Sequence, residues 1–173
     1  MNRKTRGITL GALFSALSAA CLYIASVWPT GQLGFAAFSS LFVAAAIIEI
    51  GLVSGIYVFA VSSAIGMLLA PDKAAPLLFV LFFGYYPVVK SLIERIKPPV
   101  VMWFLKLLVF NVSLTVIWLF MKVLFFGFLE NTPGALLIFL FGNAVFVLFD
   151  YGYSKVIQFY LSRISGARGR RSR

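Results

Sequence analysis

The sequence contains no histidine, a single cysteine and only five acidic residues. Zinc sites and acid–base sites are built mainly from histidine, cysteine and paired carboxylates, so these absences argue against an intramembrane enzyme. Cys21 has no partner for an internal disulfide. Ser113 and Lys106 are seven residues apart in one predicted helix and do not form a serine–lysine dyad. We expect that the protein is not an enzyme and uses no metal or cofactor.

Charge is also scarce inside a series of long apolar runs. Hydrophobic residues make up 62% of the chain and charged residues 12%. A bilayer core of about 30 Å is crossed by roughly 20 apolar helical residues. We therefore predict an all-α, polytopic membrane protein with six transmembrane helices in a single bundle, forming one domain over residues 1–162. The predicted spans are about 8–27, 33–50, 53–70, 75–96, 100–122 and 135–160.

The apolar stretch 33–70 is too long for one span. As a single helix it would extend roughly 57 Å, about twice the hydrocarbon core. Glu49, Gly51 and Gly55 place a charge and two helix-weakening glycines near its midpoint. Two spans joined by a tight turn are therefore predicted. A five-span alternative, with 33–70 partly re-entrant, would put the basic N-terminus and the basic C-terminal tail on opposite sides.

Basic residues outnumber acidic residues by 15 to 5, and they gather at one set of span ends. In the six-span arrangement, Lys73 is the only basic residue in the loops on the other side. The positive-inside rule then places both termini in the cytoplasm of a multi-pass cell-membrane protein, with the first span retained. Residues 163–173 are expected to be a basic cytoplasmic tail that favours anionic membrane lipid, not nucleic acid. Binding of nucleic acid or of a partner protein is the alternative for this tail.

Polar side chains inside spans 5 and 6 fall at matched depths if these spans are antiparallel neighbours. Lys106 then lies level with Asp150, and Asn111 lies level with Asn143. Such groups either join helices by hydrogen bonds and ion pairs or line a ligand site. Both interpretations remain open from the sequence.

The fourth span contains the segment Phe82-Phe-Gly84-Tyr85-Tyr86-Pro87. Pro87 removes a backbone hydrogen bond and clashes one turn back, so a kink is predicted there. Tyr85 and Tyr86 contact a ligand or pack between helices. Lys90 and Glu94, four residues apart, can form an ion pair.

The first span presents Ala12, Ala16 and Ala20 at strict four-residue spacing. A stripe of small residues lets a second helix approach closely, either within the bundle or from another subunit. Together with the six spans, the length, the cytoplasmic termini and the Gly51-x-x-x-Gly55 turn, this stripe resembles the S components of bacterial energy-coupling factor (ECF) transporters.

This resemblance implies a substrate-binding subunit that captures a vitamin or other micronutrient in an outward-opening pocket. It implies that Ala12, Ala16 and Ala20 contact a transmembrane coupling subunit, while two cytoplasmic ATPases power release by toppling the S component in the membrane. No vitamin-specific signature is present, so no particular substrate is implied. The polar and aromatic residues expected at the pocket are Trp28, Thr30, Gln32, Tyr85, Asn111, Trp118 and Asn143.

In this interpretation Lys106 and Asp150 lie too deep for the pocket and form a structural ion pair. A neutral or aromatic ligand suits an outer cavity with few charges. The main alternative is a non-transporting membrane scaffold, similar in size to rod-shape or division-assembly proteins, that has no ligand pocket.

Overall fold

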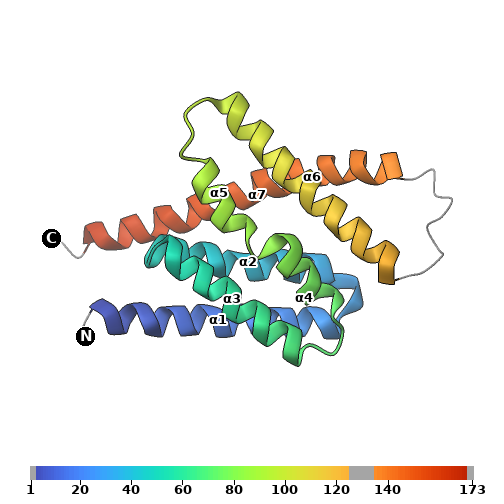
Figure 1. Cartoon of the computed structure of the whole chain (residues 1–173). Coiled ribbons are helices and arrows are strands. Elements are labelled where there is room, and N and C mark those ends of the chain that lie inside the picture. Colours follow the sequence, from blue (N-terminus) through green and yellow to red (C-terminus); the bar gives the residue numbers. More distant parts are fainter. Residues whose placement is uncertain (1–2, 125–134, 171–173) are drawn as a thin grey trace. The chain divides into compact units, whose positions relative to one another are not determined.

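The computed structural model describes residues 3–124 and 135–170 (Figure 1). It is 90% helical and has no strand in these ranges. Six of the described helical segments are long and apolar enough to cross a membrane, which confirms the all-α polytopic class and the six-span count. The segments are Thr5–Val27, Gln32–Glu49, Leu52–Leu69, Ala74–Ile93, Pro99–Phe120 and Leu137–Ser162.

The elements follow the predicted order, with one span divided into pieces. In chain order they are α1 (Arg3–Val27), the 3₁₀ turn η1 (Pro29–Gly31), α2 (Gln32–Glu49), α3 (Leu52–Leu69), α4 (Ala74–Leu78), the π-helical turn η2 (Phe79–Phe83), α5 (Tyr86–Ile93), α6 (Pro99–Leu124) and α7 (Ala135–Arg170). The chain forms two compact units, residues 1–117 and 118–173, with the boundary inside α6. The single domain over residues 1–162 stays a prediction.

The turn between α2 and α3 lies where the sequence places it. Gly51 has φ of +132°, a backbone conformation that side chains with a Cβ rarely adopt. The backbone N–H groups of Ile50 and Gly51 both donate to the carbonyl of Ala46 and close the end of α2. A glycine is therefore required at this position for the chain to reverse within two residues.

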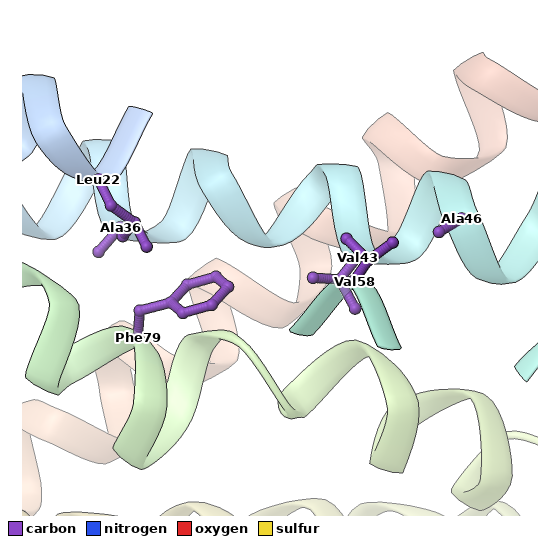
Figure 2. Packing of buried hydrophobic residues seen from close by; sticks show 6 residues of the cluster. All are labelled: Leu22, Ala36, Val43, Ala46, Val58 and Phe79. Atoms are coloured by element: carbon purple, nitrogen blue, oxygen red, sulfur yellow. The ribbon is translucent and has the colours of Figure 1, made fainter. Parts of the chain in front are cut away.

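The core of the first unit lies where α1, α2, α3 and η2 meet (Figure 2). Leu22, Ala36 and Phe79 are fully buried together, and Val43 packs near Val58 further along the same cluster. Small residues on α2 allow this close packing, which in a bilayer supplies the helix–helix association that the hydrophobic effect cannot. Ser62 Oγ on α3 also donates to the carbonyl of Ser15 on α1, at 3.3 Å.

The second unit contains α7, which is longer than a membrane span. Its apolar part covers Leu137–Ser162, close to the predicted sixth span. The helix continues to Arg170, so most of the predicted basic tail is helical. Residues 125–134, between the fifth and sixth predicted spans, and the last residues, 171–173, lie outside the described residues.

Candidate functional site

The fourth span breaks just before Pro87, as predicted. α4 passes into the π-helical turn η2, and a new helix, α5, begins at Tyr86 with Pro87 in its first turn. Pro87 has no N–H to donate, and its ring would clash with the carbonyl of Phe83 four residues earlier. A π-helical turn inside a span is a local irregularity of the kind found often at functional sites.

Aromatic rings fill the space around this break. The ring of Phe82 lies 5.1 Å from that of Tyr86 and 5.4 Å from that of Phe110 on α6. Tyr86 is fully buried, which favours the packing interpretation for its side chain. The hydroxyl of Tyr85, a predicted ligand residue, instead shares a hydrogen bond with Ser113 of α6. This hydrogen bond holds the Tyr85 hydroxyl in a fixed orientation beside the break.

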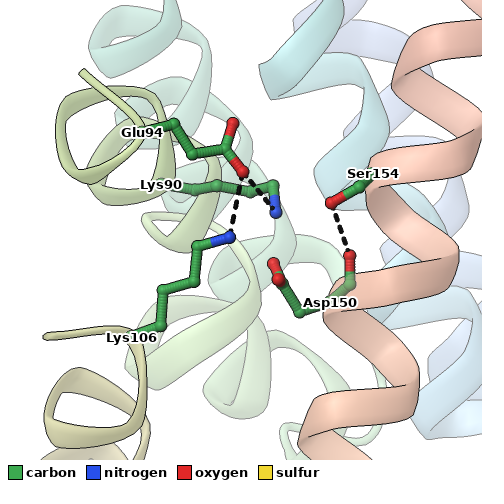
Figure 3. A network of polar contacts seen from close by, with 5 residues as sticks. All are labelled: Lys90, Glu94, Lys106, Asp150 and Ser154. Carbon is green, nitrogen blue, oxygen red and sulfur yellow. Dashed lines mark hydrogen bonds and ion pairs between the residues drawn. The ribbon is translucent and has the colours of Figure 1, made fainter. Parts of the chain in front are cut away.

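Three charged side chains meet where α5 ends (Figure 3). The ammonium groups of Lys90 and Lys106 each lie 2.9 Å from the same carboxylate oxygen, Oε1 of Glu94. The lysine side chains are 2% and 3% exposed, whereas that of Glu94 is 43% exposed. The predicted pair of Lys90 with Glu94 is confirmed. Glu94 also joins α5 to α6 through Lys106, which the sequence analysis missed.

Glu94 lies outside the membrane-spanning segments, just beyond Ile93. Partial burial raises the pKa of Glu94, but the hydrogen bonds and positive charges of Lys90 and Lys106 lower it more. The net result is a pKa below the ordinary value for glutamate. The carboxylate is therefore held in its charged form.

The structural pair of Lys106 with Asp150 would join the two units and stays a prediction. Within α7, Ser154 Oγ donates to the backbone carbonyl of Asp150 at 2.7 Å (Figure 3). The Asp150 side chain is almost fully buried. Glu94 and Lys106 lie on either side of the loop between spans 4 and 5, so antiparallel pairing of these spans is the sequence signal that indicates their proximity.

The first loop carries three predicted ligand residues. Trp28 is 63% exposed, and Thr30 is exposed beside it. Gln32 Nε2 donates to a carboxylate oxygen of Asp72, whose other oxygen accepts the backbone N–H of Ala74 at 3.1 Å. Asp72 therefore ties the first loop to the α3–α4 loop. Its position between Pro71 and Lys73 gave no signal of this long-range role.

Asn111 borders a cavity of about 590 Å³ on the surface of α6. Its Nδ2 donates to the carbonyl of Leu107 at 2.8 Å, and Thr115, which lines the same cavity, donates to the carbonyl of Asn111 at 2.7 Å. In the second unit, Asn143 Nδ2 donates to the carbonyl of Phe139 at 2.8 Å. The convergence of Asn111 with Asn143 and Trp118 on one ligand stays a prediction.

A larger groove lies between α1 and α3, with a volume of about 820 Å³. The exposed side chains of Ala12 and Ala16 line it, and Ser15, which is buried, lies beside them. Ala20, the third residue of the predicted stripe, is exposed but does not line the groove. The α3 residues that line it include Ser54, Tyr57, Val61 and Ile65.

Two further observations bear on function. Among residues 3–124 and 135–170, no three histidine, cysteine, aspartate or glutamate side chains gather as a metal-binding set. Comparison of the chain with protein-family models, curated proteins and solved structures finds no match.

Proposed function

We propose that the protein is the substrate-capture subunit of an ECF-type importer of a micronutrient, located in the cell membrane. The groove between α1 and α3, lined by Ala12 and Ala16, is the observation that carries this proposal. In a bilayer, helices gain little from hydrophobic burial and associate through close packing at small residues. An exposed small-residue face on α1 is therefore suited to a helix of a coupling subunit.

The ligand end of the proposed subunit is the end of α1 that carries Trp28. There the first loop exposes an aromatic ring and is braced by the contact between Gln32 and Asp72. Tyr85, fixed by Ser113, and Asn111, beside its cavity, supply a phenol and an amide deeper in the span region. These groups suit a neutral or aromatic molecule, because amide and phenol hydrogen bonds combined with ring stacking favour uncharged, planar ligands.

Substitution of Ala16 tests the docking role. A tryptophan at this position fills the groove. The amount of coupling subunit and ATPases that co-purify with the tagged Ala16→Trp variant should therefore be at least about tenfold lower than with the wild type. This corresponds to a loss of about 1.4 kcal/mol or more of binding free energy. Quantitative mass spectrometry of proteins recovered from the native membrane measures this. Ala60→Trp is the matched control, because Ala60 is exposed on α3 outside the groove. Equal recovery from both variants would count against the proposal.

The non-transporting scaffold is the second candidate function. It is favoured by the ring packing at the break in span 4, where the ring of Phe82 contacts those of Tyr86 and Phe110. A scaffold would be recovered with neither ATPases nor a bound small molecule. Extraction and mass spectrometry of small molecules from the purified chain separates the two functions.

A further inference from the structure

The loop between α5 and α6, residues 94–98, carries exposed positive charge at the end of two membrane-spanning segments. Arg95 and Lys97 are both exposed, and neither side chain takes part in an ion pair with any part of the chain that the structure describes. The fourth span ends at Ile93, and the fifth begins at Pro99. The two cations therefore lie at the level where lipid head groups meet water.

The neighbouring carboxylate does not neutralise these cations. Glu94 directs one carboxylate oxygen at the buried ammonium groups of Lys90 and Lys106, each at 2.9 Å. Four basic residues and one acidic residue lie between positions 90 and 106, so this hairpin has a net charge of +3. The first turn of α6 adds no acidic residue. The excess positive charge at the loop therefore attracts an anion from outside the chain.

Exposed apolar side chains flank the loop on both helices. Leu92 on α5 is 44% exposed and Val100 on α6 is 78% exposed, while Trp103 and Phe104 are exposed one turn further into α6. Tryptophan at a span end, with basic residues just outside it, is typical of side chains that contact the membrane interface. A soluble acidic protein or a free anion would leave these apolar groups uncovered. A lipid covers them with its acyl chains and meets the cations with its phosphate.

The backbone of the loop is held by hydrogen bonds that continue from α5. The N–H of Arg95 donates to the carbonyl of Leu92 at 3.2 Å, and the N–H of Ile96 donates to the carbonyl of Ile93 at 3.0 Å. The segment Pro98-Pro99 then fixes two successive φ angles before α6. Binding of an anion therefore orders the basic side chains and leaves the backbone as it is, which lowers the entropy cost.

We propose that this loop is a binding site for an anionic phospholipid, whose phosphate contacts Arg95 and Lys97 and whose acyl chains lie along Val100 and Trp103. The guanidinium binds phosphate oxygens with two parallel hydrogen bonds, and the ammonium adds a point charge. A zwitterionic lipid offers the same phosphate with a positive charge of its own, so the hairpin favours an anionic head group. The site is separate from the basic tail at residues 163–173, and the inference does not rest on the importer function.

Quenching of Trp103 by brominated lipid tests the site. Trp28 and Trp118 are replaced by phenylalanine in the full-length chain, which leaves Trp103 as the only tryptophan. In phosphatidylcholine vesicles with a minor fraction of phosphatidylglycerol, brominated phosphatidylglycerol should quench Trp103 at least about fivefold more, per mole, than brominated phosphatidylcholine does. Each basic residue near an anionic surface favours it by about this factor. Arg95→Ala/Lys97→Ala should lose the preference, and Arg95→Lys should keep most of it.

The matched control is Arg6→Ala/Lys73→Ala, which removes the same net charge elsewhere in the first unit. Arg6 is exposed on α1 and faces Glu49, and Lys73 lies in the α3–α4 loop. This variant should keep the preference at Trp103. A preference that falls equally in the control would belong to the overall charge of the chain and would refute the site.

Three further outcomes would overturn the proposal. Equal quenching of Trp103 by both lipids in the otherwise unchanged chain would mean that there is no anionic site. An unchanged preference in Arg95→Ala/Lys97→Ala would mean that these cations do not hold the lipid. Loss of the preference when inorganic phosphate is added at constant ionic strength would assign the site to a free anion.

Native mass spectrometry of the chain with its natural tryptophans gives an independent answer if the phenylalanine replacements disturb the fold. In micelles with equal amounts of the two lipids, the wild type should retain phosphatidylglycerol in preference to phosphatidylcholine. Arg95→Ala/Lys97→Ala should retain at least about fivefold less phosphatidylglycerol than Arg6→Ala/Lys73→Ala does. Equal retention by the two double variants would contradict the proposed site.

Discussion

Glu94 neutralises two lysines with a single carboxylate oxygen. Lys90 and Lys106 are almost fully buried, and an ammonium group inside a span is costly unless it is paired. The half-exposed carboxylate, just outside the span, can remain hydrated on one side while it accepts both hydrogen bonds on the other. Loss of this one charge removes an ion pair from each of two buried lysines.

The stability of the protein should therefore depend on pH through Glu94. The folded-state pKa of Glu94 is lowered by the two lysines, so its contribution is fully present above the unfolded-state value of about 4.3 and is lost as the pH falls through the lower folded-state value. The thermal midpoint of the detergent-solubilised wild type, followed by circular dichroism, should fall on acidification below about pH 4. Glu94→Gln should lower the thermal midpoint at pH 7 and reduce its fall on acidification below about pH 4 (the acid limb of the pH profile). Glu49→Gln is the control that should keep the limb, and an unchanged limb in Glu94→Gln would refute the assignment.

At the scale of the element, the break in span 4 depends on a glycine against which aromatic rings pack. A Cβ on Gly84 would lie 2.5 Å from a ring carbon of Phe59 and 2.7 Å from one of Phe79. Real side chains do not approach this closely, and both rings belong to a dense group around the break. The space at Gly84 is thus already occupied by side chains of α3 and η2.

Gly84→Ala should destabilise the protein by about 1–3 kcal/mol, because overpacking forces these rings out of their positions. Chemical or thermal unfolding in detergent measures the change. Gly34→Ala on α2 is the matched control: nothing lies within 4 Å of a Cβ there, and the better helix propensity of alanine should leave the stability equal or higher by up to about 1 kcal/mol. Equal effects of the two substitutions would contradict the packing argument.

Local signals predicted the elements well, and long-range contacts escaped them. Apolar length determined the spans, and Gly51 and Pro87 located the turn and the kink, because each acts through its own backbone. The form of the kink was not predictable, since an α turn and a π turn have the same hydropathy. The contact of Gln32 with Asp72 also escaped, because no periodicity links residues across a loop. The ligand residues of the second unit stay predictions.

At the scale of the whole molecule, the charge distribution predicts an orientation in the membrane. An even number of spans puts both termini on one side, and most of the lysine and arginine residues lie at that side, against Lys73 in the opposite loops. Lysine and arginine near span ends resist translocation, so the basic side is expected to stay in the cytoplasm. The α3–α4 loop at residues 70–73 is then outside.

Reporter fusions test this orientation. A reporter that is active only in the cytoplasm should be active when fused before residue 1 or after residue 173, and a reporter that is active only outside should be active when inserted after Asp72. The matched control is each reporter at the other's positions, where it should be silent. An external C-terminus would mean an odd number of crossings and would remove the basis for placing Trp28 at the ligand end.

The π-helical turn η2 also determines which way the C-terminal part of span 4 faces. Each residue advances an α-helix by about 100°, so one extra residue in a widened turn rotates everything after it by that angle about the helix axis. Lys90 follows the turn by seven residues and is buried among protein groups. Without the extra residue, the same ammonium would swing by more than a quarter of a revolution, away from its carboxylate. The widened turn thus sets the rotation of α5 about its axis. This rotation determines whether Lys90 points toward protein groups or toward lipid.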